Sequence, residues 1–194
     1  MKKLFVSASP HITGRQSTQK IMLHVIIALM PAVIASLLIY GLYPLVSILL
    51  CVISCVLAEF LFNLIVKRKQ SIGDLSCVVT GLILALNLPP VLPLYIPVVG
   101  GFFAILIVKM LFGGIGKNFA NPAATARIFL LLAWTSAMTS FVPAIDLTKG
   151  GYEFVKYFSL QVDTVSSATP LAFIQKGDLQ NVGLLSLFLG THGG

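Results

Sequence analysis

Long apolar runs separated by short polar stretches dominate this chain. Residues 21–41 carry no charged side chain, residues 42–66 carry only Glu59, and residues 93–111 form a third long run. A bilayer core of about 30 Å needs about 20 helical residues at about 1.5 Å each, so these runs predict membrane-spanning helices. The run over 75–88 is shorter and ends in Asn-Leu-Pro-Pro, which predicts a short or broken helix.

The remaining pattern completes the predicted topology. Asn121-Pro122 opens a helix that we expect to run to about Phe141, since proline is tolerated in a first helical turn. The pattern predicts an all-α, polytopic transmembrane protein with five spans and the start of a sixth. Its expected parts are a leader without a signal peptide, a five-helix membrane repeat, a polar segment and the start of the sixth span, at 1–20, 21–141, 142–182 and 183–194.

Composition agrees with a membrane protein and excludes other classes. The chain is 57% hydrophobic and only 10% charged, and its mean hydropathy is +0.98. An ordinary water-soluble domain carries about 25% charged residues, and a disordered chain has far less apolar surface. The three cysteines lie inside apolar runs, which excludes a disulfide scaffold and argues against a four-thiolate metal site.

The net charge of +7 indicates an orientation rather than a nucleic-acid partner. With a cytoplasmic amino terminus, ten of the thirteen basic residues fall in inner segments: Lys2, Lys3, Arg15, Lys20, Lys67, Arg68, Lys69, Lys109, Lys117 and Arg127. The positive-inside rule therefore places the chain in the cell membrane with segment 142–182 outside. No polar module gathers the basic residues as a nucleic-acid site would.

The outer segment contains the best candidate for chemistry, the run Asp-Thr-Val-Ser-Ser-Ala-Thr-Pro over 163–170. Thr169 has small neighbours that allow a modifying enzyme to approach, and Pro170 biases it toward an extended conformation. The alternative is a plain Ser/Thr-rich loop, which composition alone favours.

Two acidic residues within or beside apolar runs leave alternatives open. Asp74 precedes the short helix, where it is either a functional carboxylate of a membrane protein or a helix cap. Glu59 lies inside an apolar span, where it either lines an ion route or faces the interface, with the structural role slightly favoured. Arg127 alone is typical of an anchor at the cytoplasmic end of a helix.

A set of short motifs lies along the whole chain. They are Ser-Pro-His-Ile at 9–12, Gly-Asp-Leu-Ser at 73–76, Thr-Gly at 80–81, Leu-Pro-Pro at 88–90, Gly-Gly to Lys-Asn over 113–118, Asn-Pro-Ala at 121–123 and the run 163–169. In these motifs the chain resembles the D-subunit family of Rnf electron-transport complexes, which is related to the B subunit of the sodium-pumping NADH:quinone oxidoreductase.

The resemblance implies a urea-transporter-like architecture and two flavins. Run 163–169 is similar to a flavinylation motif, which implies that a flavin transferase joins FMN to Thr169 through a phosphoester. Asp163, Ser166, Ser167 and Ala168 would then be recognition elements, with serine at 167 where many members have glycine. The resemblance also implies a pocket for non-covalent riboflavin, with candidate residues Asp74, Thr80, Asn121 and Arg127.

The family further implies an enzyme subunit. It would be a membrane part of a ferredoxin:NAD⁺ oxidoreductase that couples electron transfer to Na⁺ or H⁺ translocation, with the flavin as electron relay. The expected partners are flavoprotein and iron–sulfur subunits of the complex. Because family members have a further, inverted half, we also expect a truncated chain. The alternative is a channel or permease for a small neutral solute, which would not need the flavin acceptor motif.

Overall fold

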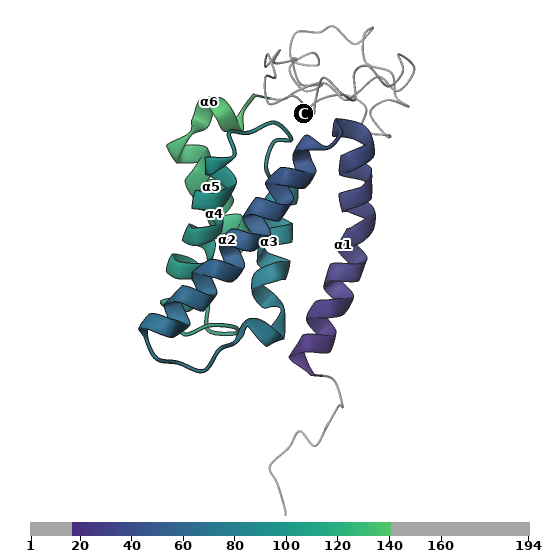
Figure 1. Cartoon of the computed structure of the whole chain (residues 1–194). Helices are drawn as coiled ribbons and strands as arrows, with labels where there is room; N and C mark the ends of the chain where they lie inside the picture. Colours follow the sequence, from purple (N-terminus) through teal and green to yellow (C-terminus); the bar gives the residue numbers. More distant parts are fainter. Residues whose placement is uncertain (1–16, 141–194) are drawn as a thin grey trace, which may run out of the picture.

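The computed structural model describes residues 17–140, and every element in this part of the chain is helical (Figure 1). Residues 1–16 of the leader, the segment 142–182 with its Thr169 motif and the start of the sixth span lie outside the described residues. The elements are α1 (Thr18–Tyr40), α2 (Tyr43–Ile65), the 3₁₀-helix η1 (Ile72–Asp74), α3 (Ser76–Leu86), α4 (Tyr95–Phe102), the π-helix η2 (Phe103–Met110), α5 (Pro122–Ala133) and α6 (Thr135–Met138).

Two helices, α1 and α2, are long and apolar enough to cross a bilayer. Each has 23 residues, and their most apolar 18-residue windows have mean hydropathies of 2.5 and 2.7. The Ser17 hydroxyl accepts a hydrogen bond from the Lys20 N–H and so caps the start of α1. Gly41 ends it at a φ of 79°, a left-handed conformation that glycine adopts without strain.

The other helices are shorter than the bilayer core. α3 has 11 residues, and α4 continues directly into η2 to form one helix over Tyr95–Met110. The helix expected over 121–141 is instead interrupted, since α5 ends at Ala133 and α6 begins at Thr135. Trp134 leaves the helical conformation at φ −131°, and its ring packs edge-on against Tyr95 with centroids 6.0 Å apart.

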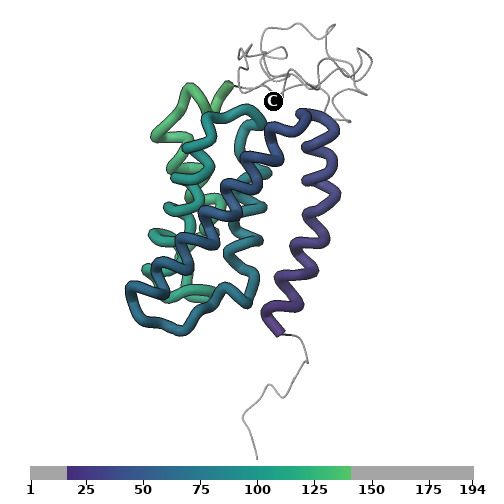
Figure 2. Tube along the Cα trace, in the orientation of Figure 1, coloured from purple at the N-terminus to yellow at the C-terminus, as the bar shows by residue number. Residues whose placement is uncertain are grey.

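α2 crosses the front of the bundle in this view and packs against α3, α4 and η2, while α1 runs along one edge against α2 and α3 (Figure 2). Small residues allow the closest approaches. Gly81 of α3 lies on the backbone of α2 at Val52, and Gly101 of α4 lies on α2 beside Ser54 and Cys51. Glycine contacts of this kind bring helix axes together in membrane proteins.

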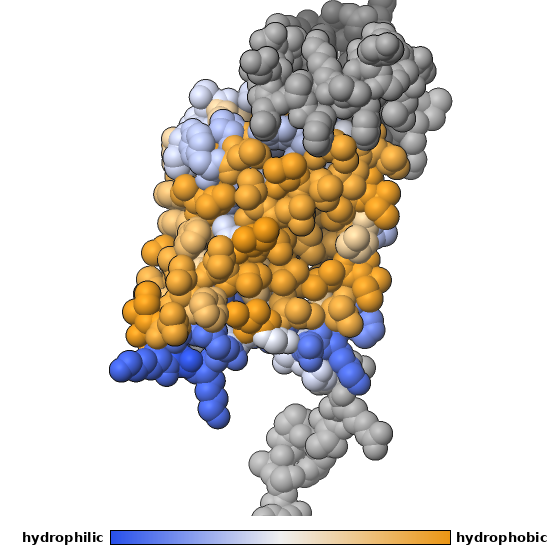
Figure 3. Space-filling view, in the orientation of Figure 1, coloured by the Kyte–Doolittle hydropathy of each residue, from blue (hydrophilic) through white to orange (hydrophobic). Residues whose placement is uncertain are grey.

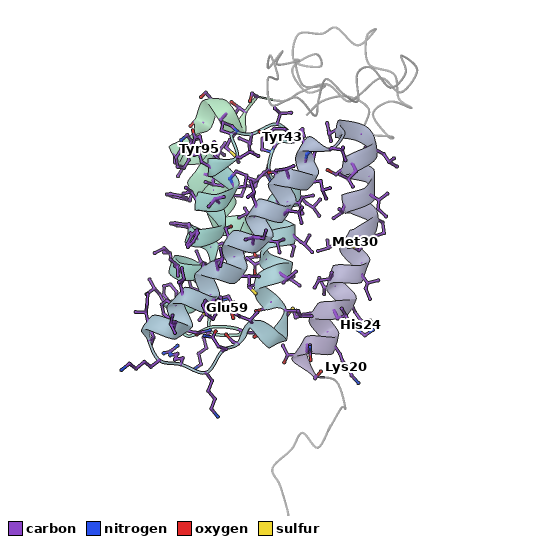
Figure 4. All side chains as sticks on the ribbon, in the orientation of Figure 1. Lys20, His24, Met30, Tyr43, Glu59 and Tyr95 are labelled. Carbon is purple, nitrogen blue, oxygen red and sulfur yellow. The ribbon has the colours of Figure 1, made fainter. Side chains whose placement is uncertain are left out.

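The surface separates into an apolar band and a charged end. Figure 3 shows orange side chains over most of the visible face and blue side chains gathered at one end. Lys20 lies at this end (Figure 4), and the chain leaves α2 there through the exposed run Lys67-Arg68-Lys69. Exposed large apolar residues cover the helices of the band, among them Ile27, Leu38, Leu64 and Leu132. An apolar surface of this extent is expected of a protein solvated by lipid.

Candidate functional site

A buried ion pair lies inside the bundle between α2 and η2. Glu59 of α2 is 0% exposed and Lys109 of η2 is 2% exposed, and the Lys109 Nζ lies 2.6 Å from the Glu59 Oε2. Figure 4 places Glu59 in the half of the bundle toward Lys20. Glu59 therefore does not face the membrane interface. Of the two alternatives drawn from the sequence, the structure excludes this one.

Hydroxyl and amide groups complete the hydrogen bonding of this pair. Ser71 Oγ donates to Glu59 Oε1 at 2.5 Å, and Asn63 Nδ2 donates to Ser71 Oγ at 3.1 Å. On the other side, Lys109 Nζ donates to Ser76 Oγ at 2.5 Å. Buried charges are tolerated only when they are paired and hydrogen-bonded in this way. We call Glu59, Asn63, Ser71, Asp74, Ser76 and Lys109 the buried polar network.

The start of α3 belongs to the same network. Leu75 adopts a left-handed conformation with φ 62°, and Asp74 Oδ1 accepts hydrogen bonds from the Ser76 N–H at 2.9 Å and the Ser76 hydroxyl at 2.7 Å. Asp74 thus satisfies the first free N–H group of α3, as the capping alternative expects. Through Ser76 it is also linked to Lys109.

The π-helix η2 sets the position of Lys109. Its hydrogen bonds join residues five apart, as between the Leu111 N–H and the Leu106 carbonyl at 3.1 Å. The Gly114 N–H likewise donates to the Lys109 carbonyl at 3.0 Å. In the orientation that satisfies both ends of its amide, Asn118 donates to the carbonyls of Lys109 and Gly114. π-Helical turns are rare and occur frequently at functional sites.

A cavity of about 380 Å³ adjoins the network, and we call it the Lys109 cavity. It brings together Thr80 and Asn121, two of the four residues expected to bind riboflavin. Asn121 also caps α5, because its Oδ1 accepts from the Ala123 N–H at 3.0 Å. The polar side chains on its wall are Ser76, Thr80, Lys109, Asn118 and Asn121, and apolar residues such as Met22, Val79, Ile83 and Ile115 complete it.

Arg127, the remaining candidate, lies elsewhere. It sits well inside α5 rather than at a helix end, and its Nη1 lies 3.5 Å from the Oδ1 of Asn87 at the far end of α3. Both residues line a second cavity of about 460 Å³, the Arg127 cavity, together with parts of α1 and α2. Ser47, a residue that is 4% exposed, also lines this cavity, and its buried hydroxyl has no hydrogen-bond partner among the described residues.

Sequence reasoning missed the buried polar network and did not predict that Lys109 is buried in it. Lys109 was expected only as one of the cytoplasmic basic residues. Its pairing with Glu59 was missed because Glu59 lies 50 positions earlier, on another helix. The available signal was one acidic and one basic residue, each isolated within an apolar run, which together indicate a buried pair. The residues of the flavinylation motif, Asp163, Ser166, Ser167, Ala168 and Thr169, lie outside the described residues.

Comparisons with known proteins agree with the resemblance read from the sequence. The profile of the NQR2, RnfD, RnfE family matches residues 5–194. The D subunit of the Na(+)-translocating ferredoxin:NAD(+) oxidoreductase complex of Acetobacterium woodii is 44% identical over 191 residues, which is 98% of this chain and 55% of that protein.

Two further relatives are the D subunits of ion-translocating oxidoreductase complexes. The protein of Aliivibrio salmonicida is 34% identical over 192 residues, covering 89% of this chain and 55% of the relative. That of Escherichia coli O7:K1 is 35% identical over 187 residues, covering 86% and 53%. The chain spans about half the length of these relatives. Together with the two membrane-spanning helices, these matches identify a membrane protein, and the chain belongs to the NQR2, RnfD, RnfE family.

Proposed function

We propose that this protein is a membrane subunit of an ion-translocating ferredoxin:NAD⁺ oxidoreductase complex and that it holds flavins which relay electrons. The names of its relatives support the complex. The observation that carries the role of this chain is the Lys109 cavity, where hydroxyl, amide and ammonium groups meet between apolar helices. A passive anchor between other subunits has no use for such a cavity.

The Lys109 cavity suits non-covalent riboflavin. Its volume of about 380 Å³ is within the range of small-molecule sites. A flavin ring has an apolar body with polar atoms on one edge, and the wall offers apolar side chains beside Thr80, Asn118 and Asn121. A bound flavin supplies the electron-transfer chemistry, and the residues of the chain bind it, orient it and exclude water.

A second flavin, FMN, is proposed on Thr169. The support is the sequence motif over 163–169, with its small residues before the acceptor threonine. In this reaction a flavin transferase cleaves the pyrophosphate of FAD, the FMN phosphate forms an ester with the Thr169 hydroxyl, and AMP leaves. The other proposed partners are flavoprotein and iron–sulfur subunits of the complex.

The same proposal includes an orientation in the cell membrane. The exposed run Lys67-Arg68-Lys69 and Lys20 lie at one end of the bundle. By the positive-inside rule this end faces the cytoplasm, which places the amino terminus there and the segment 142–182 outside. Of the other basic residues, Arg127 lies in the middle of α5, and Lys109 is buried one residue before the end of η2.

Thr169→Val tests the covalent flavin. The variant removes the acceptor oxygen and keeps the shape of the side chain, so we expect complete loss of covalent FMN. The measurement is the mass of the 163–169 peptide and the fluorescence of the band after denaturing electrophoresis. Thr164→Val, in the same motif, is the matched control and should retain FMN. Covalent FMN on the Thr169→Val protein would refute the assignment.

Asn121→Ser tests the riboflavin site. Serine also caps helices, so α5 keeps its start while the amide is withdrawn from the Lys109 cavity. The loss of one hydrogen bond should weaken riboflavin binding by about fivefold. The measurement is the riboflavin released by acid from the purified complex. Arg127→Gln, in the other cavity, should retain riboflavin. If Arg127→Gln loses riboflavin while Asn121→Ser keeps it, riboflavin binds in the Arg127 cavity and the assignment to the Lys109 cavity is refuted.

A further inference from the structure

Lys109 faces both the buried polar network and the Lys109 cavity. Its Nζ donates to Glu59 Oε2 at 2.6 Å and to Ser76 Oγ at 2.5 Å. An ammonium group has a further N–H donor beyond these two bonds. Lys109 is also one of the residues that line the cavity, and 3% of its side chain is exposed, so this remaining donor would be its contact with a ligand there.

The charge of Lys109 dominates the electrostatics of this cavity. It is the one charged side chain among the described residues that line the wall. Glu59, its counterion, does not line the cavity. Lys109 is 2% exposed, and water screens a buried charge less than an exposed one, so its charge acts on a ligand in the cavity.

The fold holds this ammonium in a fixed place. Asn118, another wall residue, donates to the Lys109 carbonyl and so fixes the backbone of η2 at this residue. Glu59 and Ser76 fix the other end of the side chain. A charge restrained at both ends undergoes little reorganisation when a ligand gains negative charge, which is the condition for effective electrostatic stabilisation.

We propose that Lys109 sets both the affinity and the reduction potential of the flavin in this cavity, with Glu59 as the counter-charge that limits its effect. The inference rests on the proposed riboflavin site. Reduction adds electrons to the flavin from a neighbouring cofactor of the complex, and the nearby ammonium favours the reduced, more electron-rich form. The covalent state of Lys109 does not change. Glu59 partly cancels the field, so the pair fixes the potential between the values that either charge alone would give.

The test compares the wild-type complex with the double variant E59Q/K109M. The double variant removes both charges and keeps side chains of similar size, so the bundle is expected to assemble. We expect riboflavin to bind about tenfold more weakly, since a hydrogen bond from a charged donor is lost. We also expect the reduction potential of the remaining riboflavin, measured by spectroelectrochemistry, to fall. K109R keeps the charge and should retain riboflavin.

A second variant gives a shift in the opposite direction. S76A removes the hydroxyl that accepts a hydrogen bond from the Lys109 ammonium. More of the Lys109 charge should then act on the cavity, so the reduction potential of riboflavin should rise. This variant also carries the test if E59Q/K109M does not assemble. If Lys109 had only a structural role, the two variants would not shift the reduction potential of riboflavin in opposite directions.

The outcomes separate the inference from the proposed function beneath it. A wild-type complex that releases no riboflavin refutes the riboflavin site itself. A wild-type complex that contains riboflavin, with affinity and potential unchanged in E59Q/K109M, overturns the role of Lys109 and leaves the site standing. An unchanged reduction potential of riboflavin in S76A would also overturn the role of Lys109 and leave the site standing. Retention of covalent FMN in every variant shows that the complex has matured normally.

Discussion

Replacing Lys109 with methionine alone should cost the solubilised complex about 3–5 kcal/mol of unfolding free energy. The variant leaves the Glu59 carboxylate buried without its counterion, because Glu59 is fully buried and the Lys109 Nζ is the one cation within salt-bridge distance among the described residues. Removing one partner of a buried pair is far more costly than removing both. E59Q/K109M should therefore recover most of the lost stability.

The measurement is a denaturant titration of the purified complex, followed by the fluorescence of the protein. Lys117→Met is the matched control, since Lys117 is exposed and its loss should change stability by less than about 0.5 kcal/mol. If E59Q/K109M is as unstable as Lys109→Met, the unpaired Glu59 carboxylate is not the cause of the lost unfolding free energy. The energetic coupling between Glu59 and Lys109 would then be refuted.

Gly81→Ala should destabilise the bundle by about 2 kcal/mol although alanine is the better helix former. A Cβ at Gly81 would lie 2.8 Å from the Val52 Cα, so α2 and α3 must move apart. The new methyl group meets backbone, which cannot rotate away as a side chain can. The cost of overpacking, about 1–3 kcal/mol, thus exceeds the gain in helix propensity, about 0.5–1 kcal/mol.

Two other glycines give a graded comparison for this prediction. A Cβ at Gly100 would meet the Leu130 Cδ1 at 2.6 Å, the end of a flexible side chain, so Gly100→Ala should have an intermediate effect. A Cβ at Gly73 has no atom within 4 Å, so Gly73→Ala should be neutral. The thermal unfolding midpoints of the three variants should follow this order. Equal midpoints for Gly81→Ala and Gly73→Ala would contradict close packing of α2 on α3.

Much of the helical pattern was predictable because hydropathy and helix breakers act locally. The run without charges over 21–41 corresponds to α1, and the run 42–66 to α2. The short α3 ends near the Pro-Pro pair, as the pattern indicates. The all-α class and the family resemblance are confirmed. The break at Trp134 was not predictable, since it depends on the packing of the indole against Tyr95 on another helix.

The candidate site was predictable only in part, because most of its contacts join residues far apart in the sequence. Thr80 and Asn121 were named from the family resemblance, and the structure places both on one cavity wall. Arg127 was grouped with them but lies on another cavity. The Glu59–Lys109 pair depends on the side-by-side packing of α2 and η2, which hydropathy does not specify.

The shortness of α3 has an electrical consequence. With 11 residues it is about 16 Å long; residues from Ser76 to Ile83 border the Lys109 cavity, and Ala85 and Leu86 border the Arg127 cavity. Along the helix axis the two linings are therefore only about 3 Å apart, from Ile83 to Ala85, which is far less than a bilayer core of about 30 Å. A membrane potential of about 100 mV is worth about 2.3 kcal/mol per elementary charge. If water from opposite sides fills the two cavities, a charge that passes between them would do most of that work over this short distance, in a field steeper than in unbroken lipid.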